Sequence, residues 1–300
     1  MIDESKYQKS RILYLFTRAP LHVGAGASVG AIDQPIQRER HTGFPIIPAS
    51  SLKGTFADAW NTALNDGKRG DGAAAWLFGS DDPNVAAAGS VLFGEGRLLA
   101  FPIRSAKGSF AWITCPLMLR RAARDGVIPT DLLKDLKEPS DEKAIFDAGN
   151  ASKLALGSKL VLEEYTFEAS GWLGLDKLGG HLAKLLADDL VWNEVASRLV
   201  ILSDGMMSYF AQNACEIAQH VKISDETGTA EGGALFNQEN VPSETLFYSV
   251  IHFMAGRGGN FKSKTADAAV TEFSNKLADQ VFQFGGDAST GLGYCTVKLS

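Results

Sequence analysis

Cysteine, long apolar runs and positive charge are all scarce in this sequence, and each scarcity excludes a class of protein. The cysteines, Cys115, Cys215 and Cys295, are too few and too widely spaced for a disulfide framework or a paired zinc motif, so we expect small buried hydrophobes. No segment approaches the ~20 apolar residues of a membrane span, and the N-terminus lacks the apolar region of a signal peptide. We therefore expect a cytoplasmic protein with no membrane partner.

Lysine and arginine, 29 in all, are outnumbered by 35 aspartates and glutamates, so the formal net charge is −6 at pH 7. A nucleic-acid-binding domain usually carries an overall positive field, so any nucleic-acid contact here must be local. The charge is segregated: residues 9–53 contain six lysines and arginines against two acidic residues, whereas residues 125–147 contain seven acidic residues against three lysines. Such segregation fits a binding face and an ordinary solvated surface about equally well.

The apolar pattern predicts strands and helices in alternation, in a chain long enough for one elaborated domain. We expect strands at residues 11–17, 91–93, 97–103, 110–115, 159–167, 198–202, 246–254 and 294–299. We expect helices at 73–78, 116–124, 181–192, 206–214 and 265–282, and at 50–65, where Ser50 and Ser51 form the cap. The five tryptophans fall within these patterns and are expected in the core.

Two features of this pattern predict the fold class. Strand–helix–strand units stand at both ends of the chain with insertions between them, which indicates an α+β, ferredoxin-like fold of the split βαβ kind. Glycines at 228, 232 and 233 lie between strand-like flanks and predict a projecting hairpin.

A glycine cluster at Gly24, Gly26 and Gly30 follows the first expected strand, as in a dinucleotide-binding loop. Such a loop must lead directly into a helix, whose N-terminal amides hold the pyrophosphate. Here prolines at 35, 45 and 48 interrupt the next segment, and the glycine spacing differs from the dinucleotide fingerprint. A second cluster, FGGDASTGLGY at 284–294, lacks the lysine of a triphosphate-binding loop. The residues alone leave two explanations, tight turns or loops whose amides approach an oxyanion.

Four segments together resemble one known family. They are PLHVGAGASVGAIDQPIQRERHTGFPIIPASSLKG at 20–54, AFPIRSAKGSFAWITCP at 100–116, GALFNQENVPSETLFYSVI at 233–251 and the second glycine cluster. They resemble the RAMP superfamily, and within it the repeated backbone subunit of the Cmr (type III-B) CRISPR effector complex. The likeness spans nearly the whole chain, and its first block is too long for chance agreement.

The resemblance implies a single RAMP domain with a ferredoxin-like (RRM-like) palm, an inserted lid and a projecting thumb β-hairpin. The palm is expected at about 9–120 and 199–300, the lid at about 121–198 and the thumb at about 221–245. Several copies are expected to stack as a helical filament on guide (CRISPR) RNA, together with other Cmr subunits. The thumb then displaces a nucleotide of the guide–target duplex at each interval, and the target RNA is cut there. Because neighbouring copies share the RNA, local basic residues suffice.

The resemblance also implies a catalytic site. Asp33 matches the aspartate that cleaves target RNA in that family, in a reaction that requires the assembled complex. Attack by the neighbouring 2′-hydroxyl needs a base, an in-line approach and relief of phosphate charge, which a carboxylate holding Mg²⁺ or Mn²⁺ supplies together with a displaced nucleotide. His22 matches a histidine of the same site and is a candidate acid, base or phosphate ligand.

The thumb contributes a third candidate. Related chains are rich in tyrosine and glutamate where this chain has Asn237, Gln238, Glu239 and Asn240, so Glu239 is the sole acid available for an auxiliary catalytic role. From the residues alone, the alternatives are a turn cap for Asp33, a structural histidine for His22 and a solvent-facing acid for Glu239.

Further residues are expected at the RNA. Lys53, with Ser50 and Ser51, lies at the start of a helix whose exposed amides favour a guide phosphate. Arg38 and Arg40 flank Glu39 and either pair with it or contact RNA. Contacts to the guide strand are expected from the amides of Gly285, Gly286, Gly291 and Gly293 and from the hydroxyl of Thr290. The thumb wedge is expected to include Thr229, Leu235 and Phe236, although core packing of the hairpin explains Phe236 equally well.

Three other functions stay open. The first is a scaffold that binds guide and target RNA without cutting either. The second is a relative that processes precursor guide RNA as an isolated chain, with His22 as general base and no metal. The remote third is a nucleotide-binding metabolic enzyme, which both glycine clusters disfavour.

Overall fold

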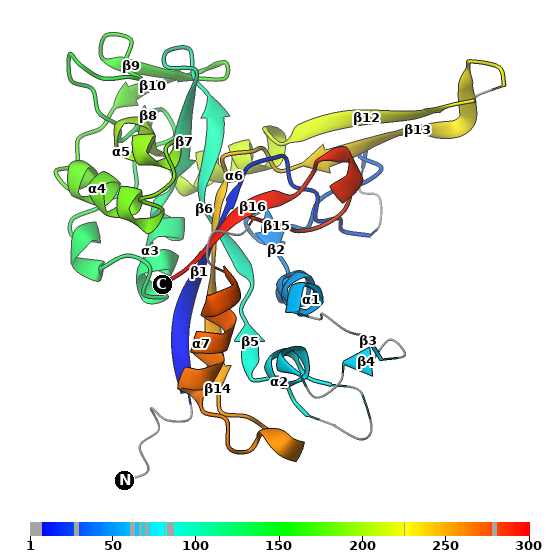
Figure 1. Cartoon of the computed structure of the whole chain (residues 1–300). Helices are drawn as coiled ribbons and strands as arrows, with labels where there is room; N and C mark the ends of the chain where they lie inside the picture. Colours follow the sequence, from blue (N-terminus) through cyan, green and yellow to red (C-terminus); the bar gives the residue numbers. More distant parts are fainter. Residues whose placement is uncertain are drawn as a thin grey trace.

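The computed structural model describes residues 8–26, 30–60, 64–65, 68–69, 72–80, 82, 87–224, 226–277 and 281–300. Its central strands are β1 (Gln8–Thr17), β6 (Gly96–Arg104), β14 (Leu246–Met254) and β16 (Tyr294–Leu299), which lie side by side in the order β6-β14-β1-β16. All three pairings are antiparallel, and helices α1 (Ala49–Trp60) and α7 (Ala266–Leu277) follow β1 and β14 (Figure 1). This is the ferredoxin-like topology, so the α+β prediction is confirmed.

Strand β1 is buried on both faces of the sheet. Its side chains alternate, so Leu13 and Leu15 belong to one hydrophobic cluster while Tyr14 and Phe16 belong to another. Residues of α1 and α7 complete the first cluster, and residues of α4 (Leu175–Leu185) complete the second. Burial of each large apolar side chain contributes roughly 1.5–3 kcal/mol, which explains why β1 is a continuous apolar run rather than an alternating one.

Residues 110–201 add two strands to the central sheet and place further elements beside it, in the part of Figure 1 drawn from blue-green to yellow-green. The elements of this segment are β7 (Phe110–Thr114), α3 (Pro116–Arg124), β8 (Lys143–Ala144), β9 (Lys159–Leu162), β10 (Tyr165–Ala169), α4, α5 (Val195–Arg198) and β11 (Leu199–Ile201), with short 3-10 helices at Thr130–Leu133 and Trp192–Glu194. Strands β8, β10 and β9 form a small separate sheet, whereas β11 pairs in parallel with β7 and extends the central one. The residue limits of a palm and a lid stay a prediction.

The remaining elements lie at the edges of the central sheet or project from it. They are β2 (Ile46–Ile47), β3 (Leu64–Asn65), β4 (Lys68–Arg69), α2 (Ala73–Phe78), β5 (Val91–Phe93), α6 (Asp204–Asn213), β12 (Glu216–Ile223), β13 (Ala230–Asn240) and β15 (Val281–Gln283), with 3-10 helices at Gly259–Phe261 and Ala288–Thr290. Strands β12 and β13 form a two-stranded sheet separate from the central one, which is the expected projecting hairpin, here called the thumb hairpin (Figure 1).

Several expected boundaries are wrong for physical reasons. Helix α1 begins at Ala49, so Ser50 and Ser51 lie inside its first turn and do not cap it, and it ends at Trp60. The strand expected at 159–167 is a hairpin of β9 and β10, because Glu163 takes a positive φ of 49° and turns the chain. The helix expected at 181–192 is α4, at Leu175–Leu185, and α7 ends at Leu277 because β15 follows at Val281.

The aromatic and sulfur-containing side chains mostly take their expected places. Four tryptophans are buried, and Trp172 is partly buried against the second cluster. Cys115 and Cys295 are buried, which raises the pKa of both thiols and keeps them protonated, whereas Cys215 is partly exposed. Among the described residues, no helix has both the length and the apolar character to cross a membrane.

Candidate functional site

Three segments far apart in sequence meet at one end of the central sheet: the stretch after β1, the end of β13 and the second glycine cluster. Backbone hydrogen bonds join Leu21 to Val241 (2.8 and 2.9 Å), Gln34 to Asn237 (3.1 Å), Gly286 to the carbonyl of His22 (3.0 Å) and Gly293 to the carbonyl of Pro20 (2.8 Å). The proline-broken stretch after β1 cannot form a helix, so it lies extended and makes isolated bridges to its neighbours. Both glycine clusters thus lie beside residues 237–240, the base of the thumb hairpin, here called the thumb junction.

Asp33 is exposed and held by Asn237 of the thumb junction. The backbone N–H of Asp33 donates to Asn237 Oδ1 (2.7 Å), and the backbone N–H of Asn237 donates to Asp33 Oδ2 (2.9 Å). Asn237 Nδ2 also donates to the carbonyl oxygen of Ala31 (3.0 Å). The carboxylate is therefore fixed at the foot of the thumb hairpin while still open to solvent.

His22 is 7% exposed and lies on the other side of the thumb junction. Its Nδ1 donates to the carbonyl oxygen of Glu239 (2.7 Å), because a carbonyl accepts only. In the neutral ring Nε2 is then the remaining acceptor. A Cβ at Gly24 would lie 2.9 Å from Nε2, so a glycine there leaves room for the ring. His22 is thus an oriented histidine that also ties the first glycine cluster to the thumb.

Glu239 and Arg38 form an internal ion pair, which corrects two expectations. Glu239 is 3% exposed, and its carboxylate accepts from Arg38 Nη2 (2.5 Å) and from the backbone N–H of Ile36 (3.1 Å). Arg38 Nη1 also donates to the carbonyls of Gly43 (2.7 Å) and Ala211 (2.8 Å). Glu239 is neither a solvent-facing acid nor free to take a proton from RNA, and the guanidinium of Arg38 faces protein groups rather than a groove.

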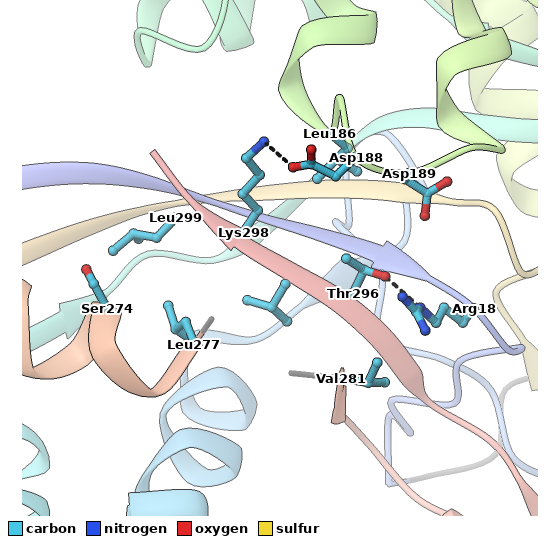
Figure 2. Close-up of a pocket in the computed structure, with 11 residues that line it drawn as sticks. Arg18, Leu186, Asp188, Asp189, Ser274, Leu277, Val281, Thr296, Lys298 and Leu299 are labelled. Atoms are coloured by element: carbon cyan, nitrogen blue, oxygen red, sulfur yellow. Dashed lines mark hydrogen bonds and ion pairs between the residues drawn. The ribbon is translucent and has the colours of Figure 1, made fainter. Parts of the chain in front are cut away.

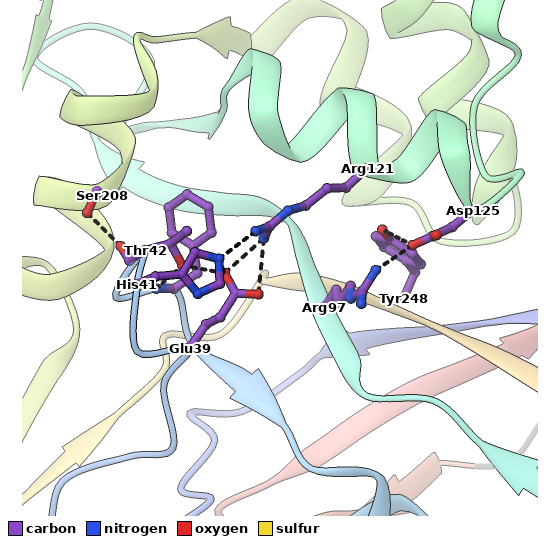
Figure 3. A network of polar contacts seen from close by, with 9 residues as sticks. Glu39, His41, Thr42, Arg97, Arg121, Asp125, Ser208 and Tyr248 are labelled. Atoms are coloured by element: carbon purple, nitrogen blue, oxygen red, sulfur yellow. Dashed lines mark hydrogen bonds and ion pairs between the residues drawn. The ribbon is translucent and has the colours of Figure 1, made fainter.

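Glu39, between the two arginines, pairs with neither of them. Its carboxylate accepts from Arg121 Nη1 (2.9 Å) and from the hydroxyl of Thr42 (2.5 Å), and the ring of His41 lies 3.5 Å away (Figure 3). Partial burial acts to raise the pKa of Glu39, but hydrogen bonds from Thr42 and Arg121 outweigh it and lower the pKa. Arg40 is exposed, so its expected RNA contact stays a prediction.

The same face carries a second ion pair, also drawn in Figure 3. Asp125 Oδ2 accepts from Arg97 Nη1 (2.8 Å) and from the hydroxyl of Tyr248 (2.9 Å), which links α3 to strands β6 and β14. Burial and the neighbouring Asp125 raise the pKa of Tyr248, so this phenol donates and does not act as a base. The first network joins the loop after β1 to α3, and the second joins the end of α3 to the central sheet.

The second glycine cluster needs glycine at two positions. At Gly285 φ is +77°, and an added Cβ would lie 2.0 Å from the carbonyl oxygen of His22. At Gly293 φ is +79°, and a Cβ would lie 2.0 Å from the carbonyl oxygen of Phe284. Gly285, Gly286 and Gly291 are exposed whereas Gly293 is buried, and the hydroxyl of Thr290 donates within the turn to the carbonyl of Asp287 (2.9 Å).

The expected phosphate contacts at α1 are open to solvent. Lys53 and Ser50 are exposed and Ser51 is partly exposed, all within the first five residues of the helix. The hydroxyl of Thr55 in the next turn donates to the carbonyl of Gln283, which places α1 next to the second glycine cluster. These residues stay predicted RNA contacts.

The thumb hairpin presents more apolar surface than the sequence analysis assigned to it. Leu235 is 67% exposed and pairs across the hairpin with Val221, on a face that also includes Ile217. Phe236 points to the opposite face and stacks on His220 at 5.0 Å, which supports packing within the hairpin. Thr229 is exposed at the tip. Apolar residues at alternate positions of β12, Ile217, Val221 and Ile223, are the sequence signal that indicates this surface.

The few possible ligands around Asp33 limit which metal ion could bind there and how it could be coordinated. Among the described residues no group of three or more histidine, cysteine, aspartate or glutamate side chains could hold an ion. A single exposed carboxylate fits Mg²⁺ or Mn²⁺ only if water and substrate phosphate supply the other ligands, as is common for Mg²⁺ in phosphoryl-transfer sites.

A cavity of about 510 Å³ lies elsewhere, between β16, α7 and residues 186–189 (Figure 2). Lys298 pairs there with Asp188 (3.6 Å), and Arg18 Nε donates to the hydroxyl of Thr296 (2.7 Å). None of the residues predicted for the catalytic or RNA-binding site lines this cavity.

Comparison with known proteins agrees with this arrangement. Residues 15–296 match the RAMP superfamily. The chain is 31% identical, over 97% of its length and 96% of the relative's, to the CRISPR system Cmr endoribonuclease Cmr4 of Pyrococcus furiosus. Oligomeric Cmr4 from the same organism superposes with a TM-score of 0.69 at 26% identity, covering 97% of this chain and 98% of that one. A chain of the type III-B Cmr-beta complex bound to cognate target RNA shares the fold, with a TM-score of 0.70 at 20% identity over 98% of both chains.

Proposed function

The chain belongs to the RAMP superfamily and, within it, to the family of the Cmr4 subunits; from this premise we propose that it is the repeated backbone subunit of a type III-B CRISPR ribonucleoprotein. In that complex, copies of the chain bind guide RNA as a helical filament alongside other Cmr subunits. Each copy cleaves the complementary target RNA once, at Asp33. The family membership and the relative's endoribonuclease activity support this assignment.

One observation carries the proposal: the exposed carboxylate of Asp33 is held by Asn237 at the foot of the thumb hairpin, and both glycine clusters lie beside that thumb junction. A hairpin with exposed apolar side chains beside this carboxylate suits a target strand whose nucleotide is displaced from the duplex. The amides of the second glycine cluster and the exposed Lys53 supply local guide contacts without an overall positive charge.

The chemistry follows from these positions. The target 2′-hydroxyl loses its proton, its oxygen attacks the adjacent phosphorus, and the bond to the 5′-oxygen breaks as that oxygen gains a proton. The products are a 2′,3′-cyclic phosphate and a 5′-hydroxyl end. Asp33 would orient the hydroxyl and, with water and substrate phosphate as the other ligands, would hold a divalent ion whose chemistry is to relieve charge on the phosphate. His22, on the other side of the thumb junction, is the candidate group to accept the proton of the 2′-hydroxyl or to donate one to the 5′-oxygen, and displacement of the nucleotide gives the in-line geometry.

Reconstitution of the complex with Asp33→Ala tests the proposal. We expect wild-type complexes to cut target RNA at regular intervals with Mg²⁺ or Mn²⁺, and we expect the variant to bind target normally but cut at least about 100-fold more slowly. A chelator should stop cutting and leave binding intact. Regular cuts that persist in Asp33→Ala would overturn Asp33 as the cleavage residue.

A non-cleaving scaffold is the second candidate, and the burial of Glu239 favours it. The sole acid of the thumb junction is neutralised by Arg38, so the thumb offers no second carboxylate to the reaction. A wild-type complex that binds target tightly yet leaves it uncut with either metal would establish this alternative.

A further inference from the structure

We propose that Asn237 is a positioning residue, which orients the Asp33 carboxylate and makes cleavage depend on the position of the thumb hairpin. This inference rests on the proposed function and extends it to a residue outside the reacting groups. Asn237 lies on β13, more than 200 positions away from Asp33 in sequence, and it contacts the loop of Asp33 through both its side chain and its backbone.

Three hydrogen bonds define the role of Asn237. Its side-chain oxygen accepts from the Asp33 N–H, its side-chain nitrogen donates to the Ala31 carbonyl, and its own N–H donates to the Asp33 carboxylate. Only a side chain that both donates and accepts within this short reach makes the first two bonds together. An aspartate at 237 keeps the acceptor, loses the donor to Ala31 and places a second negative charge beside the carboxylate of Asp33.

The residues around Asn237 make the link to the hairpin stiff. On one side, Phe236 stacks on His220 and Leu235 pairs with Val221, so contact with RNA along the hairpin acts on the same strand. On the other side, Gln238 Nε2 donates to Asp287 Oδ2 (2.6 Å) of the second glycine cluster.

Glu239, the residue after Gln238, anchors β13 to the loop after β1, because its carboxylate pairs with Arg38. Strand β13 is thus fixed to two loops at its base, and Asn237 is the point where it reaches the carboxylate. Because this link is stiff, a hairpin that moves on RNA carries with it the group that orients Asp33, which fits the expectation that cleavage requires the assembled complex.

Complexes reconstituted with Asn237→Ala, Asn237→Asp and Gln219→Ala separate positioning from folding. Gln219 is the matched control, because it is exposed and lies directly across the hairpin from Asn237. We expect Asn237→Ala to lower the single-turnover rate at saturating target by about 10–100-fold with little change in target Kd, since small misplacements at a reacting centre have effects of this size. Asn237→Asp should be at least as slow, and Gln219→Ala should match the wild type.

Hydrogen exchange in the isolated chain gives a readout that does not need cleavage. Asn237→Ala should speed amide exchange in the peptide that contains Asp33, whereas Gln219→Ala should not. Wild-type cutting rates in Asn237→Ala, or rate losses matched by equal losses of target affinity, would overturn the proposal. A wild-type complex that never cuts would overturn the proposed function, and the cleavage role of Asn237 with it. Unchanged exchange at Asp33 in Asn237→Ala would refute the positioning contact alone.

Discussion

The base and the outer part of the thumb hairpin differ in both polarity and burial. At the base, Gln238, Glu239 and Asn240 are polar and at most 3% exposed, and the first two are bonded to other segments. Further out, Val221 and Leu235 are apolar and at least half exposed. A buried polar base costs stability unless its partners are kept, whereas exposed apolar side chains favour contact with another molecule. The contrast fits the proposal that the base fixes the geometry of the site and that the outer part contacts RNA.

The largest effect is expected from breaking the base. Glu239→Ala leaves Arg38 as an uncompensated buried charge, so we expect a loss of about 3–5 kcal/mol in the free energy of unfolding. Chemical denaturation of the isolated chain measures it. Glu226→Ala, which removes an exposed acid near the tip of the same hairpin, should stay within about 0.5 kcal/mol of the wild type. Equal effects of the two variants would contradict the contrast.

Glycine substitutions test whether the second glycine cluster is tied to the base. Gly285→Ala brings a Cβ within 2.0 Å of the His22 carbonyl, so both segments must shift, whereas at Gly291 no atom lies within 4 Å of the added Cβ. Both positions have positive φ, so both variants carry backbone strain of about 1–3 kcal/mol. We expect Gly285→Ala to lose more thermal stability and more guide RNA affinity than Gly291→Ala. Indistinguishable variants would mean that the close approach to His22 has no effect.

Changing the outer part of the hairpin should act on RNA and spare the fold. Leu235→Ser removes the most exposed apolar side chain of the hairpin face while leaving the base intact. We expect unfolding to change by at most about 0.5 kcal/mol and target cleavage to fall about tenfold, because an apolar wedge that props apart a base step acts against unstacking of a few kcal/mol. Denaturation and single-turnover cleavage on the same preparation measure both. A folding defect with normal cleavage would reverse the assignment.

The smallest effects are expected from pH, where two glutamates, Glu39 and Glu95, which both lie near Arg121, should behave oppositely. The pKa of Glu39 is lowered, so its stabilising contribution is present above the unfolded value of about 4.3 and is lost as pH falls through the folded value. Burial raises the pKa of Glu95, so its contribution is present at low pH and is lost as pH rises through the raised value.

Unfolding curves from pH 7 to pH 3.5 compare the two glutamates. Glu39→Gln should be less stable than the wild type at neutral pH, and Glu95→Gln should be more stable there. Both differences should shrink below about pH 4, where carboxylates become protonated. The same sign for both variants at neutral pH would be inconsistent with this account.

Sequence patterns predicted the elements whose signals are local. Alternation and flanking turns placed β5, β14 and β16 at their observed limits, and Pro116 at the first position marked the start of α3. The order of strands and helices was enough for the ferredoxin-like class. The hairpin of β9 and β10 was missed because its turn depends on Glu163, a residue type that rarely takes a positive φ.

The site was harder to predict because its contacts are distant in sequence. Nothing around Glu239 indicates that Arg38, 201 positions away, neutralises it, since that depends on the register of the loop against β13. The hydrogen bonds between Asp33 and Asn237 also depend on this register and could not be predicted from the residues around either position. The family resemblance located the site loop, but only coordinates separate the side chains that face solvent from those that hold the loop in place.

The central claim is that Asp33 of each copy makes one cut in the target. Complexes assembled from mixtures of wild-type and Asp33→Ala chains, analysed by the ladder of target fragments, test it most directly. We predict that cutting at every position falls in proportion to the mutant fraction, while the remaining cuts keep their spacing and rate. A ladder that is unchanged at high mutant fraction, or that loses only one fixed position, would contradict the account.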